Sequence, residues 1–229
     1  MERYSKDLLK HLSGFVTENR LSLFRQVVER RTRYVTVLLE DIYQSQNASA
    51  VLRTCECLGI QDVHIVEQRN EYEINPDVAV GSNQWLTMHY YKEAQENIFK
   101  ATGALRKNGY RIVATSPHEG EHTPESIDLT KGKIALMFGT ELNGLTDQAL
   151  SLADEFIQIP MVGFTESYNI SVSAGVILYR IRNRLEHSEV DWKLSRTEQE
   201  ELILGWLKSS IKMSEQIENQ FRDEYPPTF

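Results

Sequence analysis

Short apolar stretches rich in β-branched residues alternate with helical stretches through most of this chain of 229 residues. The clearest strand is YVTVLLEDI at Tyr34–Ile42, after which Asn47 is placed to cap a helix that runs through Leu58 and ends at Gly59. Such strands, apolar on both faces, are typical of a mostly parallel sheet with helices on both faces. The alternation therefore predicts an α/β fold. Further strands are expected at residues 63–66, 85–91, 110–115, 134–138 and 156–159, with a loop at 68–84. Further helices are expected at 93–107, 146–152 and 169–185.

Helices are also expected at both ends of the chain. Residues 5–31 carry leucine, phenylalanine and valine at helical spacing, which indicates one or two helices, and residues 197–221 have the pattern of one amphipathic helix. The character of the sequence changes after Glu186. We therefore divide the chain into an N-terminal helical extension at 1–33, an α/β domain at 34–187 and a C-terminal helical extension at 188–229.

The charge of the chain is negative overall but unevenly spread. The formal net charge is −8, which argues mildly against a nucleic-acid partner, yet residues 1–40 hold eight Lys/Arg against five Asp/Glu. Residues 186–229 hold five Lys/Arg against ten Asp/Glu. A local basic patch can bind phosphates whatever the sign of the whole molecule, although a solvated helix face is the plainer interpretation. Five arginines fall within fourteen residues: Arg20, Arg25, Arg30, Arg31 and Arg33.

Targeting segments, membrane spans and metal sites find no support in the sequence. The start of the chain has neither a basic-then-apolar signal segment nor an arginine-rich transit peptide, and Glu166 interrupts the most apolar long window. Cys55 and Cys57 lack the Cys/His partners of a zinc set, and His118 and His122 are expected to be solvated. We therefore expect a cytoplasmic protein without a metal or a membrane segment.

Polar and glycine-containing motifs follow two of the predicted strands. Asn47 and Arg53 come after the first strand, where the guanidinium of Arg53 offers a fork of donors that suits a phosphate or carboxylate. A surface arginine paired with a neighbouring glutamate is the alternative. Gly139, Glu141 and Gly144 follow a later strand, where the glycines allow a tight turn and close approach of a ligand. Turns of this kind are also common without a ligand.

A third motif opens the predicted helix at 169–185. Ser167, Asn169 and Ser171 exceed the needs of helix capping, since one capping residue would suffice. All three motifs lie at predicted carboxyl ends of strands, where open α/β sheets bind ligands. The sequence therefore predicts a small-molecule pocket formed largely by backbone groups. It contains no GxGxxG, P-loop, GxSxG or HExxH motif, so a standard dinucleotide site is disfavoured.

The order of these motifs resembles that of the three signature motifs of the SPOUT superfamily, and more narrowly of its SpoU/TrmH branch of RNA ribose 2′-O-methyltransferases. Helices before and after the core make the chain look closest to the tRNA guanosine-18 2′-O-methyltransferases within that branch. The resemblance covers residues 34–184. The matching residues are Asn47…Arg53, Gly139…Glu141…Gly144 and Ile159-Pro160…Ser167-Tyr168-Asn169-Ile170-Ser171.

The resemblance implies a deep trefoil knot within residues 134–185 and S-adenosylmethionine bound in that knot. Tyr168 and Pro117 stand where relatives usually carry leucine, and both side chains preserve apolar contact. Main-chain groups would hold the adenine of the cofactor, with matching positions at Thr115, Pro117, Gly139, Ile159, Met161 and Tyr168.

The same resemblance implies methyl transfer to a ribose 2′-hydroxyl of RNA, most simply tRNA, by a homodimer. Arg53 takes the place of the family's key catalytic arginine, and we assign RNA docking to the five arginines at 20–33. A ribosomal RNA 2′-O-methyltransferase of the same branch is one alternative, and a catalytically silent RNA-binding relative is another. The remaining catalytic residues are expected to be Asn47, Glu141, Ser167 and Asn169.

Overall fold

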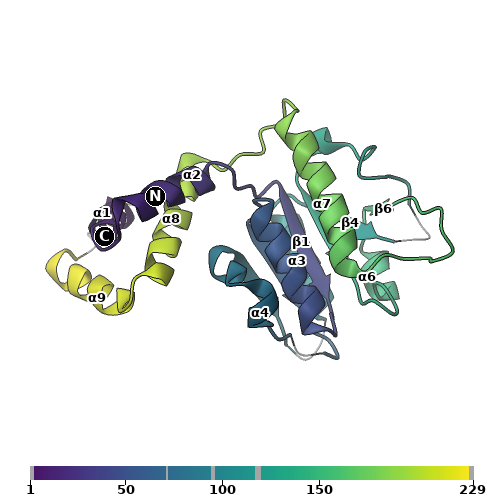
Figure 1. Ribbon diagram of the computed structural model, residues 1–229, viewed down its shortest axis with the longest axis horizontal. Coiled ribbons are helices and arrows are strands. Elements are labelled where there is room, and N and C mark those ends of the chain that lie inside the picture. The colour runs from purple at the N-terminus through teal and green to yellow at the C-terminus, as the bar shows by residue number, and fades with distance from the viewer. Residues whose placement is uncertain (1–2, 71, 94–95, 117–119, 227–229) are drawn as a thin grey trace. The chain divides into compact units, whose positions relative to one another are not determined.

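The structure of the chain is a computed structural model that describes residues 3–70, 72–93, 96–116 and 120–226 (Figure 1). The chain divides into two compact units. The larger unit contains Thr32–Trp192, and the smaller unit combines Met1–Arg31 with Lys193–Phe229. Among the described residues, no helix is long and apolar enough to cross a membrane.

The larger unit is built around a six-stranded sheet in which every pair of neighbouring strands is parallel. The strand order is β3-β2-β1-β5-β4-β6, so β1 and β5 lie side by side in the interior, with Leu39 opposite Phe138. The prediction of a mostly parallel sheet is confirmed. The strands are β1 (Val35–Glu40), β2 (Asp62–Val66), β3 (Thr87–Tyr91), β4 (Arg111–Thr115), β5 (Ile134–Phe138) and β6 (Glu155–Ile157).

Helices cover both faces of the sheet, as the sequence predicts. On one face, Val51 and Ile177 share a buried core with Leu39 of β1. On the other face, Ile98 packs in a second core with Leu38, the neighbour of Leu39. Successive side chains of a strand point to opposite faces, so β1 joins the two cores. The helices of this unit include α3 (Ser45–Cys57), α5 (Asn97–Lys107), α6 (Asp147–Ser151) and α7 (Ile170–Glu186).

Two local predictions in this unit are wrong. Asn47 does not cap α3, because the helix begins two residues earlier with Gln44 at the cap position, and Asn47 lies buried in the first turn. The predicted loop at 68–84 contains α4 (Pro76–Ala79) and begins the short 3₁₀ helix η1 (Ser82–Trp85). The side chain of Asn75 caps α4 by accepting hydrogen bonds from two backbone amides of its first turn.

The smaller unit is formed by helices from both ends of the chain. Helix α8 packs against α1 and α2, and α9 packs against α1 and α8. The two terminal segments, expected as separate extensions, therefore share one core, which includes Leu8, Phe24 and Trp206. The helices are α1 (Arg3–Ser13), α2 (Glu18–Val28), α8 (Arg196–Ser210) and α9 (Ser214–Glu224).

The single helix predicted for residues 197–221 is wrong as well. The helix is interrupted between α8 and α9, where Met213 adopts a φ of 70°. A capping box formed by Ser195 and Glu198 starts α8. The break lets Phe221 of α9 turn back and contact the rings of Tyr4 and His11 on α1.

Candidate active site

A pocket of about 350 Å³ lies at the carboxyl ends of β4, β5 and β6. Its lining comes mainly from three segments that begin at the last residues of these strands: residues 115–116 from β4, residues 138–145 from β5, and positions between 157 and 177 from β6. These strand ends are the predicted place for a ligand in an open α/β sheet. The volume lies within the range of sites for small molecules and cofactors.

The turn after β5, residues 139–144, forms one wall of this pocket and is closed by backbone contacts. The amide of Thr140 donates to the carbonyl of Gly144 at 2.9 Å, and the amide of Gly144 donates back at 3.0 Å. A Cβ atom added to Gly139 would lie 2.2 Å from the backbone of Gly144 and Leu145. Gly144 has a φ of 68°. Both glycines are therefore required for the shape of this wall.

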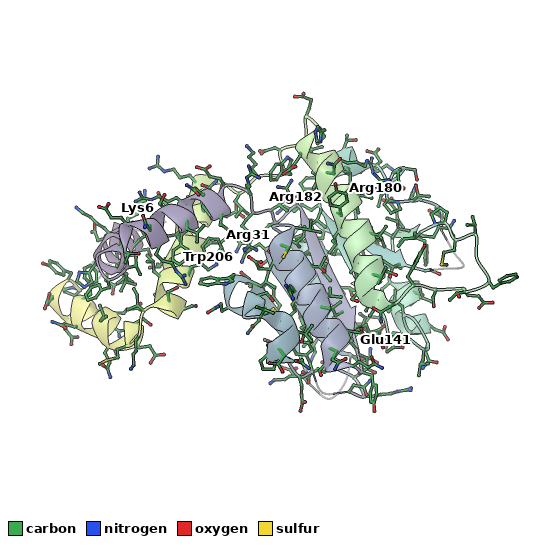
Figure 2. The ribbon with its side chains drawn as sticks, in the orientation of Figure 1. Lys6, Arg31, Glu141, Arg180, Arg182 and Trp206 are labelled. Carbon is green, nitrogen blue, oxygen red and sulfur yellow. The ribbon has the colours of Figure 1, made fainter. Side chains whose placement is uncertain are left out.

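A polar network joins the three sequence motifs. Asn47 on α3 donates from Nδ2 to the carboxylate of Glu141 at 2.5 Å, and Asn169 donates from Nδ2 to Oδ1 of Asn47 at 3.1 Å. The Oδ1 atom of Asn169 also accepts from the backbone amide and the hydroxyl of Ser171, so Asn169 caps α7. Figure 2 shows Glu141 near the beginning of α7, whereas Arg180 and Arg182 lie towards its other end. The network fixes the position of Glu141 relative to α7.

Sequence reasoning missed Gln44, whose Oε1 accepts a second hydrogen bond from Nδ2 of Asn47 at 3.0 Å. Both protons of the Asn47 amide are therefore bound, one by Glu141 and one by Gln44. Gln44 precedes the first turn of α3 and had no sequence signal that set it apart from the polar residues around it.

Most of the residues assigned to the cofactor lie around the pocket. Pro117 falls outside the described residues. Two of the residues assigned to catalysis, Glu141 and Ser167, also line the pocket. The members of the cofactor set found in the lining are Thr115, Gly139, Ile159, Met161 and Tyr168.

The other predicted catalytic residues are placed differently. Asn47 and Asn169 reach the pocket through the hydrogen bond to Glu141 and are not among the described residues that line it. Arg53 lies on α3, is exposed to solvent and does not belong to that lining either. Arg53 is therefore available to a group that approaches from outside the protein.

The five arginines at 20–33 do not form one surface. Arg20, Arg25 and Arg30 are exposed in the smaller unit. Arg31 is 1% exposed, and its guanidinium lies 5.5 Å from the ring centroid of Trp206 (Figure 2). Arg33 belongs to the larger unit and forms an ion pair with Asp62 at 2.9 Å. The burial of Arg31 beside Trp206 leaves no exposed guanidinium for a phosphate, which argues against the docking role predicted for it.

A second group of polar side chains lies on the neighbouring strands β2 and β3, outside the pocket lining. The rings of His64 and His89 are stacked with centroids 4.4 Å apart, and His89 contacts the carboxylate of Asp62 at 3.2 Å. Burial, aided by the neighbouring His89, lowers the pKa of His64 to about 4. Within the described residues, no group of three His, Cys, Asp or Glu side chains is arranged to hold a metal ion.

Comparison with known proteins gives a consistent result. Residues 34–179 match the model of the SpoU rRNA Methylase family. A tRNA (guanosine(18)-2′-O)-methyltransferase of Borreliella burgdorferi is 43% identical over 220 residues, which is 93% of this chain and 97% of that protein. The crystal structure of the Aquifex aeolicus TrmH/SpoU tRNA modifying enzyme superposes with a TM-score of 0.74 at 27% identity, covering 85% of this chain and 98% of that one.

The fold is also similar to that of the SpoU methyltransferase AviRb from Streptomyces viridochromogenes, solved in complex with AdoMet. The TM-score is 0.58 at 20% identity, over 72% of this chain and 62% of that one. At this identity the similarity concerns the fold.

Proposed function

This chain belongs to the SpoU rRNA methylase family, and from that membership we propose that it transfers a methyl group from S-adenosylmethionine to the 2′-hydroxyl of guanosine 18 in tRNA. The observation that carries this proposal is the match over 93% of the chain to a relative named for that reaction. The joined motifs Asn47, Glu141 and Asn169 support it, because they connect the pocket wall to the helices that flank it. Action on tRNA places the protein in the cytoplasm.

The volume and the lining of the pocket suit S-adenosylmethionine. Residues 139–144 line the cavity, and Gly139 packs against the backbone of Gly144 and Leu145 with no room for a Cβ atom. This closely folded main chain is the wall that we propose for an adenine held by main-chain groups. Leu145, Ile157 and Ile159 supply apolar surface for the purine ring. When bound, S-adenosylmethionine supplies an electrophilic methyl group on a positively charged sulfur.

The protein's own residues then have to place the ribose and help its hydroxyl proton to leave. A ribose hydroxyl is a weak nucleophile, so alignment with the methyl group and removal of the proton both lower the barrier. Arg53 is far too basic in its free form to accept that proton at neutral pH. We assign to Arg53 the binding of a substrate phosphate, which brings its guanidinium to the hydroxyl. There it stabilises the negative charge that develops on the oxygen as the methyl group leaves the sulfur and the hydroxyl proton passes to solvent water. Ser167 lines the pocket, and we assign to it a contact with the ribose.

The helical unit is the proposed docking surface for tRNA. Arg20, Arg25 and Arg30 are exposed and lie on or just after α2. Contacts between such side chains and phosphates give affinity without reading sequence. The smaller unit would thus hold the tRNA while the larger unit carries out methyl transfer.

A trefoil knot within residues 134–185 is also proposed. β6 lies at one edge of the sheet, but α7, which follows it, packs against α3. The intervening chain lines the same pocket as the segments that follow β4 and β5. A knot requires the chain after β6 to pass through a loop formed by the preceding segments, and this neighbourhood of the three segments supports such a path, although knots are rare among proteins.

We further propose that the protein is a homodimer in which the second copy covers α7. Val172, Val176 and Tyr179 form a stripe at helical spacing and are 47%, 38% and 56% exposed. Apolar surface of this kind on a helix next to a site is typical of an interface. Because it adjoins the pocket, the dimer contact would hold α7 and the cap residue Asn169 in place.

The proposal is tested with labelled S-adenosylmethionine and unmodified transcripts of tRNA and ribosomal RNA, followed by mapping of the methylated ribose. Transfer to guanosine 18 by the wild type, with at least a hundredfold loss of kcat in Arg53→Ala, is expected. Arg106→Ala is the matched control, since Arg106 is an exposed arginine whose guanidinium binds Asp154. Transfer to ribosomal RNA alone would favour the alternative that the family description suggests. No transfer to either RNA would favour a silent RNA-binding protein.

A further inference from the structure

Glu40, the last residue of β1, is a charged side chain buried at the edge of the site. It is 1% exposed. Its Oε2 accepts the backbone amide of Thr146 at 2.9 Å, and its Oε1 accepts the hydroxyl of Thr146 at 2.7 Å. The side-chain amide of Gln68 donates to the same Oε1 at 2.9 Å. Three donors therefore stabilise a carboxylate in a position where an isolated charge would be costly.

Thr146 connects this carboxylate to the wall of the pocket. It follows Gly144 and Leu145 at the base of the 139–144 turn, and its own hydroxyl caps α6 by accepting from the amide of Ala149 at 3.1 Å. In the register between β1 and β5, Leu39 lies opposite Phe138. Glu40, the next residue of β1, therefore lies beside the start of the turn. Glu40 thus anchors the end of a turn whose beginning is fixed by the sheet.

Glu40 itself is not among the described residues that line the pocket. Its influence on a ligand must pass through Thr146 to the backbone of the turn, which carries Glu141 and, through it, the contact with Asn47. Glu40 also contacts Gln68, which lies in the segment that follows β2. One carboxylate thus has two sets of contacts, and only one of them reaches the pocket.

We propose that Glu40 is a positioning residue for methyl transfer: its two hydrogen bonds to Thr146 hold the 139–144 turn in the conformation that binds S-adenosylmethionine. This inference rests on the proposed function for the identity of the ligand. Gln68 stabilises the same carboxylate without holding the turn.

The experiment compares Glu40→Gln, Thr146→Val, Thr146→Ser and Gln68→Ala in the full chain. The dissociation constant for S-adenosylmethionine is measured by calorimetry without RNA, and KM and kcat are measured with tRNA. Glu40→Gln and Thr146→Val are expected to weaken cofactor binding by about tenfold, the loss associated with one hydrogen bond to a charged group. Thr146→Ser retains both contacts and should bind as the wild type does. The KM for the cofactor should rise more than kcat falls.

Gln68→Ala is the control for a merely stabilising role. It should lower the melting temperature without changing the dissociation constant of the cofactor. If Thr146→Val lowers the melting temperature as Gln68→Ala does and also leaves cofactor affinity unchanged, the inference is overturned. Wild-type protein that binds S-adenosylmethionine but methylates no RNA would contradict the proposed function alone, because the affinities still test Glu40. A wild type that fails to bind the cofactor would contradict both.

Discussion

Asn169 donates a hydrogen bond to Asn47 at 3.1 Å across 122 residues of sequence, and Asn47 in turn donates to Glu141. The cap of α7, the first turn of α3 and the turn after β5 are therefore held in one arrangement. The direction of each bond is defined, because an ionised carboxylate can only accept.

This direction makes the Asn47–Glu141 contact testable by exchange. Asn47→Asp replaces the donor by a second carboxylate, so repulsion should displace Glu141 and reduce kcat/KM by one to two orders of magnitude. The double variant Asn47→Asp with Glu141→Gln restores a donor–acceptor pair in the opposite sense, and it should recover part of the loss. Steady-state methyl transfer to tRNA measures both. If the double variant loses as much activity as Asn47→Asp and Glu141→Gln lose separately when their effects are added, the two side chains act independently.

Gly139→Ala should abolish cofactor binding. The added Cβ atom meets the backbone of Gly144 and Leu145 at 2.2 Å, so the turn has to open at the pocket wall. Gly103→Ala on α5 is the matched control, because nothing lies within 4 Å of its added Cβ atom and alanine favours a helix. Calorimetric titration with S-adenosylmethionine should give no binding for the first variant and wild-type binding for the second. Retained affinity in Gly139→Ala would exclude this turn as the cofactor wall.

Reversing the exposed arginines of the helical unit should weaken tRNA binding. The triple variant Arg20→Glu, Arg25→Glu and Arg30→Glu removes three phosphate contacts, so the slope of log affinity against log salt should flatten by about three. A triple reversal of Lys193, Lys212 and Arg222, exposed residues of the C-terminal segment, makes the same change in net charge. If the control flattens the slope and the first variant does not, docking belongs to the C-terminal segment.

The low pKa of His64 should make the protein less stable in mild acid. In the folded chain the ring stays neutral down to about pH 4, whereas in the unfolded chain it binds a proton near pH 6.5. The unfolded state therefore binds more protons within this window, and the free energy of unfolding falls as the pH is lowered through it, by up to about 3 kcal/mol. His64→Phe keeps a ring for stacking on His89 but cannot titrate.

Urea unfolding at several pH values between 4 and 7 measures this effect. Glu40 contributes in the opposite direction, since burial raises its pKa, but its contribution is common to both proteins and cancels in the comparison. The difference in unfolding free energy between the wild type and His64→Phe should change with pH across the window. A constant difference would contradict the assigned role of His64.

The parallel sheet and its two layers of helices were predictable because strands buried on both faces carry unbroken apolar runs. The strand at β1 is close to such a run, with Thr36 and the terminal Glu40 as its polar members, and its prediction needed no knowledge of partners. The same is true of the turn at Gly139 and Gly144, whose residue types indicate a close backbone approach. The candidate site was predictable to the extent that its residues follow strands directly.

The features that could not be predicted depend on contacts between segments that are far apart in the sequence. Arg30 and Arg31 look alike in sequence, but their surroundings in the structure differ. The side chain of Arg31 is buried beside the ring of Trp206, which comes from the other end of the chain. Asn47 looks like a helix cap, yet Glu141 and Asn169 bind it inside the first turn. Glu40 gave a signal that went unused, since a charged residue within an apolar strand has to find donors somewhere.

The shared core of the helical unit has a consequence for biosynthesis. α1 and α2 are synthesised before any part of Thr32–Trp192, and α8 and α9 are synthesised only after that whole segment. Until then, apolar side chains such as Leu8 and Phe24 lack the surface that buries them in the finished molecule. The proposed tRNA-holding unit can thus form only after translation has passed α9, so a nascent chain cannot engage tRNA through it before the methyl-transferring unit has been synthesised.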